Sequence, residues 1–264
     1  MLIKITNQCG MGCSHCMEDS TPAPNQHMAW DTFLAALEFS QRVEGALWGA
    51  AGVPVLLSGG ECSEHPEFIR YLEHIHSLKW PVILISNGMW LNDPELKAAI
   101  LRPEWSNMQI QISNDPRVYP TAPPPCDDPR VYFVPTLTHI IKLGRAKKRQ
   151  PDGIAHRKYP ASFNLRSLTR ALNSFSKAVQ TMRVRVTTGQ SQTGNCTPSV
   201  THEGHVLAGE TRGCWQVGTV HSTDRELTRA VIDMGECNHC GLEDNLGQRE
   251  RRAIGLSSLY LPNE

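Results

Sequence analysis

The sequence predicts an α/β protein, namely an open, TIM-like partial (β/α)6 barrel followed by a small cysteine-rich region with a β-hairpin and a helix. Short runs rich in Ile and Val alternate with helical patterns along the first two thirds of the 264 residues. Near residue 188 the composition changes, and Gly, Thr, Ser and Cys become frequent. Most of the nine cysteines fall into two groups, one near the start of the chain and one near its end.

Six apolar runs have the length and the residue types of buried parallel strands. Helical patterns between several of these runs indicate βαβ units, and six strands are too few for a closed eight-stranded barrel. In such folds the functional loops follow the carboxyl ends of the strands. The expected strands are residues 2–6, 53–58, 81–86, 108–113, 131–134 and 182–188.

Three apolar stripes at helical spacing predict helices between the strands. The Pro-rich segment 114–130 can be neither helix nor central strand, so we expect a long ordered loop there. Residues 142–160 are basic and rich in turn formers. The stripes are Ala36, Phe39, Val43 and Leu47; Phe68, Leu72, Ile75 and Leu78; and Leu165, Leu168, Leu172, Phe175 and Val179.

Charge and hydropathy narrow the class of protein. Lys and Arg together balance Asp and Glu, which argues against a generally basic nucleic-acid binder. No apolar run reaches the length of a membrane span, and the N-terminus has no signal-peptide pattern. We therefore expect a cytoplasmic protein with no membrane partner, whose cysteines bind metal or react rather than form disulfides.

The first cysteine group has the spacing Cys-x3-Cys-x2-Cys directly after the first expected strand. A [4Fe–4S] cluster usually takes four cysteine ligands, so three would leave one iron open to a ligand that is not protein. The alternative is a zinc site with His15 as fourth ligand, although His15 lies between two of the cysteines, a poor reach for a chelating imidazole. The candidate ligands are Cys9, Cys13 and Cys16.

This spacing, its place after the first strand, and His15 just before the third cysteine resemble the radical S-adenosylmethionine (SAM) superfamily. The resemblance implies a [4Fe–4S] cluster whose open iron binds SAM, with an external one-electron reductant such as flavodoxin or ferredoxin. It further implies cleavage of SAM to a 5′-deoxyadenosyl radical, which takes a hydrogen atom from a substrate C–H bond.

Further motifs follow successive strands in the order that the resemblance implies. The segment Ser58, Gly59, Gly60 and Glu61 is similar to the family's Gly-Gly-Glu motif, in which Glu61 would accept the SAM amino group. Taken singly, these motifs are also common as turns and helix caps. The other residues that the resemblance assigns to SAM binding are His15, Asn87, Ser113, Asn114 and Arg145.

The second cysteine group spans a predicted hairpin, a helical pattern and the tetrapeptide Cys-Asn-His-Cys. Four thiolates suit either zinc or an iron–sulfur cluster. Attached to the first region, the pattern resembles the twitch domain, the short form of the SPASM extension. The resemblance implies an auxiliary [4Fe–4S] cluster and two domains, residues 1–188 and 189–264. Its candidate ligands are Cys196, Cys214, Cys237 and Cys240.

Two cysteines stand apart from these groups. Cys126, in the Pro-rich loop, is a candidate hydrogen-atom donor to a substrate radical or an extra ligand, with a tolerated loop residue as the simpler alternative. Cys62 follows Glu61 and is expected to fill the core as a small buried residue.

The predicted function is therefore radical SAM chemistry, with the auxiliary cluster accepting an electron in a net oxidation. Because the first strand begins at residue 2, we expect a small-molecule or nucleotide substrate rather than a peptide bound by a preceding domain. A nucleotide is also compatible with the basic run at residues 145–158, whose simpler interpretation is a solvated loop. The alternatives are a peptide-modifying maturase, a radical isomerase, and a non-catalytic iron–sulfur or zinc sensor.

Overall fold

The computed structural model describes residues 1–23, 26–48, 54–134, 139–140, 145, 155–156, 198–209 and 214–234. The strands are β1 (Leu2–Lys4), β2 (Val55–Ser58), β3 (Val82–Ser86), β4 (Met108–Ser113), β5 (Val131–Val134), β6 (His139–Ile140), β7 (Ala155–His156), β8 (Ser199–Val200), β9 (His205–Leu207) and β10 (Gln216–Thr219). The α-helices are α1 (Trp30–Trp48), α2 (Phe68–Ser77), α3 (Pro94–Ile100) and α5 (Asp224–Met234), and the 3-10 helices are η1 (Cys62–Glu64) and η2 (Met89–Asn92).

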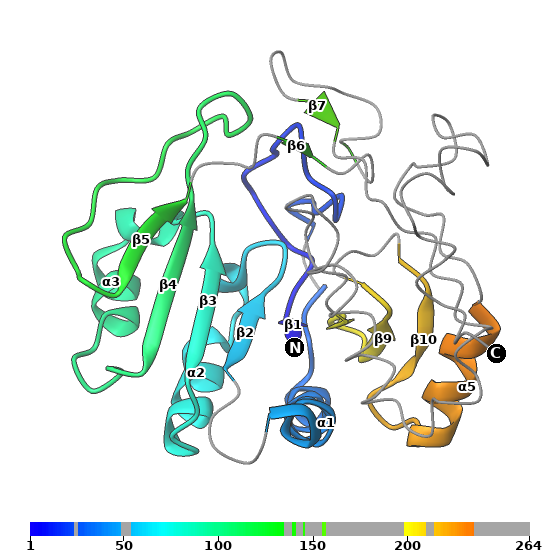
Figure 1. Cartoon of the computed structure of the whole chain (residues 1–264). Helices are drawn as coiled ribbons and strands as arrows, with labels where there is room; N and C mark the ends of the chain where they lie inside the picture. Colours follow the sequence, from blue (N-terminus) through cyan, green and yellow to red (C-terminus); the bar gives the residue numbers. More distant parts are fainter. Residues whose placement is uncertain are drawn as a thin grey trace, which may run out of the picture.

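A large, mostly parallel sheet organises the described residues. Its strand order is β10-β9-β8-β1-β2-β3-β4-β5, and β6 pairs separately with β7. Strands β1 to β5 are parallel neighbours, and β8 also runs parallel to β1. From β8 the sheet continues as an antiparallel meander, with β9 paired to β8 and β10 paired to β9. Figure 1 shows β9 and β10 on the opposite side of β1 from β2–β5.

One face of the sheet packs on the helices. Alternate residues of β2, β3 and β4 are buried, as strands with one covered face require. Helix α2 contributes Phe68, Leu72 and Ile75 to the core, and α1 contributes Phe39 and other residues. Figure 1 shows α2 and α3 behind the strands β2–β5. The alternate residues of β2, β3 and β4 that face away from this core are half-buried or exposed.

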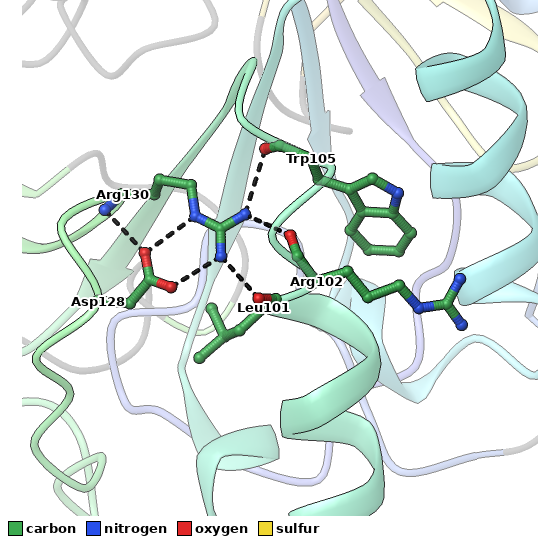
Figure 2. Close-up of polar contacts among 5 residues, drawn as sticks. All are labelled: Leu101, Arg102, Trp105, Asp128 and Arg130. Carbon is green, nitrogen blue, oxygen red and sulfur yellow. Dashed lines mark hydrogen bonds and ion pairs between the residues drawn. The ribbon is translucent and has the colours of Figure 1, made fainter.

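Arg130 fixes the end of α3 to the start of β5 (Figure 2). Its guanidinium donates hydrogen bonds to the carbonyl oxygens of Leu101, Arg102 and Trp105 (2.8, 2.8 and 3.2 Å). Its remaining N–H groups bind the carboxylate of Asp128 at 2.9 and 2.7 Å, so all five donors are used. Leu101 is the C-cap of α3, so the Arg130 side chain supplies a donor to a carbonyl at the helix end.

The first five expected strands are confirmed, with β1 and β2 each two residues shorter than predicted. The first two helical stripes lie on α1 and α2, but Leu78 lies beyond α2 and is 38% exposed. The predicted hairpin at residues 203–205 is the β8–β9 turn, and residues 114–130 form a loop as expected. The strand at 182–188, the helix at 165–179 and the domain boundary at 188 lie outside the described residues.

In the part of the chain that the structure describes, no helix is long and apolar enough to cross a membrane. Helix α1 is the longest of these helices, and it carries acidic and basic side chains along its length.

Candidate functional site

The three cysteines of the first group lie together in the loop after β1, which we name the cysteine loop (residues 7–20). Cys9 and Cys13 are buried and form a small cluster with Met11, against which Cys16, Met89 and Tyr119 pack. All three cysteines are free thiols. The predicted set of three ligands is therefore gathered at the carboxyl end of β1, where a barrel site is expected.

Burial makes the thiols of Cys9 and Cys13 reluctant to ionise. Desolvation raises the pKa of Cys9 to about 11 and that of Cys13 to about 12. Neighbouring negative charges act in the same direction, from Glu61, Glu64 and Cys16 on Cys9 and from the other two cysteines on Cys13. A buried group of thiols becomes thiolate when a metal or cluster supplies compensating positive charge. The donor set thus fits a soft, cationic group such as iron–sulfur or zinc.

The glycines of the Gly-Gly-Glu segment allow the backbone after β2 to approach the cysteine loop closely. The N–H of Gly60 donates to Thr6 O (2.7 Å), and the N–H of Glu61 donates to Gln8 O (2.8 Å). A Cβ at Gly60 would lie 2.3 Å from Gln8 O, and one at Gly59 would lie 2.7 Å from Thr6 O. Because both obstacles are backbone atoms, a side chain at either position would displace the loop.

The carboxylate of Glu61 is turned inward. Glu61 is only 2% exposed, and its Oε1 accepts hydrogen bonds from the backbone and hydroxyl of Ser63 (3.2 and 2.7 Å) and the hydroxyl of Ser86 (2.9 Å). Its Oε2 accepts the backbone N–H of Asn87 at 2.6 Å. Burial raises the pKa of Glu61, while these donors lower it. The carboxylate, expected from sequence to accept the SAM amino group, here ties the loop after β2 to the loop after β3.

Asn87 connects this buried carboxylate to the first cysteine. It is 7% exposed, its Oδ1 accepts the backbone N–H of Met89 (2.9 Å), and its Nδ2 lies 3.9 Å from Cys9 Sγ in donor geometry. N–H groups directed at cluster sulfurs are among the features that set reduction potential. The sequence assigned Asn87 to SAM, and the structure places it against the proposed cluster ligand.

Arg145, which binds the cysteine loop, and His15, which is part of it, each have a buried side-chain nitrogen without a hydrogen-bond partner among the described residues. Arg145 donates to the carbonyl oxygens of Cys13 (3.0 Å) and Ser20 (2.6 Å), yet its buried Nη2 has no hydrogen-bond partner among the described residues. The buried Nδ1 of His15 also has none among these residues. Since unsatisfied buried polar atoms are rare, these nitrogens mark a place where a further polar or anionic group fits.

Three further residues predicted to bind SAM lie at or just after the ends of β2 and β4. Ser58 ends β2, where its carbonyl accepts the N–H of Ile5 (2.9 Å), and Ser113 ends β4, where it hydrogen-bonds to Tyr119. The backbone N–H of Asn114 donates to Val134 O (2.9 Å), which extends the β4–β5 pairing. Ser58 and Ser113 are the last residues of their strands and Asn114 follows β4, and contact of any of the three with SAM stays a prediction.

Several cysteines are not brought to this loop. Cys126 packs against the main core and lies near Arg130, so the structure offers no support for a hydrogen-donor role. Cys62 is fully buried in the core, as expected. Cys214 lies two residues before β10 and against Gly209. Cys196, Cys237 and Cys240 lie outside the described residues, and among those described no group of three or more His, Cys, Asp or Glu is arranged to hold a single metal ion.

Two residues of the site have no sequence motif. Glu64 accepts the backbone N–H of Gly10 at 2.8 Å and so holds the cysteine loop beside Cys9. Tyr119 packs on the cysteines and meets the His15 ring edge to face, with centroids 5.1 Å apart. Burial raises the pKa of the Tyr119 hydroxyl. A hydrogen bond to backbone and a packing contact from a distant loop leave no spacing pattern that sequence reasoning could detect.

Comparison with known proteins adds little beyond this geometry. No protein-family model matches the chain, and no curated protein matches it. Among solved structures, the chain is similar to Streptococcus suis SuiB bound to S-adenosylmethionine, with 10% identity and a TM-score of 0.43. The match covers 78% of this chain and 59% of SuiB, so the chain spans less than two thirds of that protein. With so low a score and identity, this likeness decides neither the fold nor the function.

Proposed function

We propose that this protein is a radical SAM enzyme. One observation supports the proposal above the others: the three clustered thiols of the cysteine loop, two of them buried, meet the Gly-Gly-Glu segment and Asn87 at the carboxyl ends of β1, β2 and β3. Taken alone, each of these three features is only a common turn or a small group of cysteines. Three such loops converging in space, in the order predicted from the sequence, favour a shared cofactor.

The residues present fit the cofactors that the proposal needs. Cys9, Cys13 and Cys16 would hold a [4Fe–4S] cluster, with burial excluding water from it. When bound, that cluster would supply one electron to SAM and yield methionine and a 5′-deoxyadenosyl radical. The candidate SAM-binding residues are His15, Ser58, Gly59, Gly60, Glu61, Asn87, Ser113, Asn114 and Arg145. The carboxylate of Glu61 also accepts the backbone N–H of Asn87 and so holds that residue in place.

The finer parts of the proposal concern the substrate and the second cysteine group. Cys196, Cys214, Cys237 and Cys240 would hold an auxiliary [4Fe–4S] cluster that accepts an electron from the substrate, which makes the net reaction an oxidation. A small molecule or nucleotide is the proposed substrate, and flavodoxin or ferredoxin the class of electron donor. A peptide substrate and a net isomerisation are the alternatives within the same chemistry.

The test is formation of 5′-deoxyadenosine by anaerobically reconstituted, reduced protein supplied with SAM. Wild-type protein should form it, and Cys13→Ala should form none, because one of the three cluster ligands is gone. Arg70→Gln is the matched control, since Arg70 is exposed on α2 and pairs with Glu67 at the surface. Absence of 5′-deoxyadenosine from wild-type protein with intact clusters would refute the proposal.

The second candidate is a zinc protein without SAM chemistry. His15 lies within the cysteine loop, and its buried Nδ1 has no hydrogen-bond partner among the described residues, which favours this candidate. Against it, no group of three or more His, Cys, Asp or Glu in the described part of the chain is arranged to hold a single ion. Metal analysis of protein purified anaerobically separates the two. Zinc bound in a ratio that drops in His15→Ala, with no SAM cleavage, would establish the zinc site. Iron and sulfide that persist in His15→Ala would establish the cluster.

A further inference from the structure

Arg145 reaches the cysteine loop from far along the chain. It makes three hydrogen bonds to carbonyl oxygens there: its backbone N–H donates to Cys16 (2.9 Å), its Nε to Cys13 (3.0 Å) and its Nη1 to Ser20 (2.6 Å). The guanidinium also lies 3.6 Å from the carboxylate of Asp19. These partners span residues 13–20, the half of the cysteine loop that carries the second and third cysteines.

Residues 13–20 have other contacts as well: Lys4 Nζ donates to Glu18 Oε1 (2.6 Å), the hydroxyl of Ser20 donates to Asn7 Oδ1 (3.1 Å), and the His15 ring packs against Tyr119. None of these three contacts is to the backbone of Cys13 or Cys16. Cys16 makes a long backbone hydrogen bond to Cys13 O (3.4 Å), and Asp19 has a positive φ of 54°, a conformation that costs energy in a residue other than glycine. A planar guanidinium with several donors suits carbonyls that diverge from a tight turn, and its permanent charge strengthens each bond. Arg145 therefore offsets the strain of residues 13–20.

The first cysteine is held by different contacts. The N–H of Cys9 donates to Thr21 O (2.8 Å), the N–H of Gly10 donates to Glu64 Oε1 (2.8 Å), and Asn87 Nδ2 approaches the Cys9 sulfur. None of these contacts involves Arg145. The first cysteine is thus held mainly by the loops after β2 and β3, whereas residues 13–20 are held by Arg145 together with Lys4 and Asn7.

We propose that Arg145 is a positioning residue that holds Cys13 and Cys16, but not Cys9, in their ligating arrangement. Its significance for cluster binding rests on the proposed function, whereas its effect on the loop can be measured without any cofactor. The buried Nη2 has no partner in the part of the chain that the structure describes, so contact with SAM would be an addition to this role.

The experiment is site-resolved alkylation of the full-length, metal-free chain by iodoacetamide under native conditions, read by fragment-ion mass spectrometry. In Arg145→Gln, Cys13 and Cys16 should react about tenfold faster than in the wild type, since opening that segment breaks fewer charge-assisted hydrogen bonds. Cys9 should keep its wild-type rate. Cys62, fully buried in the core, reports global unfolding and should also be unchanged.

The matched controls are Arg70→Gln, which should leave all four rates unchanged, and Arg145→Lys, which keeps the charge but not the fork of donors. Lys should leave Cys13 and Cys16 reactive. Equal acceleration of Cys9 and Cys62 would show general destabilisation and overturn the proposal, as would unchanged rates in Arg145→Gln or full rescue by Lys.

A second measurement links the loop to the cofactor. In reconstituted protein, Arg145→Gln should alter the electron paramagnetic resonance signal of the reduced SAM-binding cluster and speed its loss to a chelator, with the Cys214→Ala background removing any auxiliary signal. If wild-type protein binds no iron, the proposed function fails while the alkylation result still stands. If the cluster forms and its signal and stability match those of the wild type, the positioning role fails.

Discussion

Glu61 illustrates how neighbours determine the role of one residue. From the sequence, Glu61 completes a Gly-Gly-Glu motif and is predicted to accept a hydrogen bond from the SAM amino group. In the structure its carboxylate accepts hydrogen bonds from Ser63, Ser86 and Asn87 and is almost fully buried. A carboxylate with this many internal donors contributes to the protein's own stability, whether or not SAM is present.

We therefore predict that Glu61→Gln destabilises the ligand-free protein. One carboxylate oxygen becomes an amide that faces N–H and O–H donors, which should cost roughly 1–3 kcal/mol of unfolding free energy. Urea unfolding of metal-free protein measures this change, with Glu67→Gln, at an exposed pair on α2, as the control. Unchanged stability combined with weaker SAM binding would restore the direct acceptor role.

A second prediction concerns Gly60, where the neighbouring backbone leaves no room for a side chain. A Cβ there would lie 2.3 Å from the carbonyl oxygen of Gln8, and neither backbone can move without displacing Cys9. Gly60→Ala should therefore lower iron incorporation several-fold under reconstitution, while Gly12→Ala, whose Cβ would meet nothing within 4 Å but whose φ is positive, should cost less. Equal iron content in Gly60→Ala and wild type would show that the close approach is not needed.

At the scale of elements, Arg130 and Asp128 join α3 to β5 (Figure 2). The pair is mostly buried, and the guanidinium beside Asp128 holds the pKa of that carboxyl below its usual range. A depressed pKa in the folded state adds stability that is present above the unfolded pKa of about 3.9 and is lost as pH falls through the folded value.

Asp128→Asn should accordingly destabilise the protein by about 1–2 kcal/mol at pH 7, and the difference from the wild type should shrink below about pH 4. Unfolding in urea at several pH values measures it. Glu73→Gln is the control, because its pair with Arg102 has a similar distance of 2.7 Å but is far more exposed. That pair should be worth at most about 0.5 kcal/mol. A difference independent of pH would contradict the assignment to Asp128.

Which helices and strands could be predicted from the sequence depended on the length and regularity of their apolar pattern. Strands β3, β4 and β5 were located to within one residue, because a continuous Ile- and Val-rich run has few alternatives to a buried strand. Helix α3 was not predicted, although Asp93 caps it through Glu95 and Leu96 and Pro94 is its first residue. Short helices lack the periodic stripe on which the predictions relied.

The residues of the candidate site likewise fall into those that belong to a local sequence motif and those that do not. The cysteines and glycines have local spacing and were predicted, whereas Glu64 and Tyr119 act through contacts from other loops and were not. Arg145 was predicted from a resembling tetrapeptide, but its bonds to the cysteine loop follow only from the tertiary structure. Local chemistry is readable from sequence, and the orientation of side chains across loops requires the fold.

For the whole molecule, the described part of the C-terminal region is continuous with the main sheet. Strand β8 pairs with β1, and Val200, Val206, Val217 and Leu227 belong to the same core as Ile3. The chain before β10 is fixed by the hydrogen bond from Ala208 N–H to Trp215 O (2.8 Å), next to Cys214. The proposed auxiliary site would thus be built on the sheet that carries the cysteine loop.

This continuity leads to a prediction that separates the two proposed clusters. Cys214→Ala should lower the iron content to about half, because four thiolates normally hold a fully ligated [4Fe–4S] cluster. The cysteine loop follows β1 and keeps its own contact with Glu64, so SAM cleavage to 5′-deoxyadenosine should continue. Cys13→Ala should instead abolish SAM cleavage while it retains the other half of the iron. Loss of cleavage in both variants, with folding intact by circular dichroism, would mean that the two sites act as one, whereas full iron content in Cys214→Ala would remove Cys214 from the ligand set.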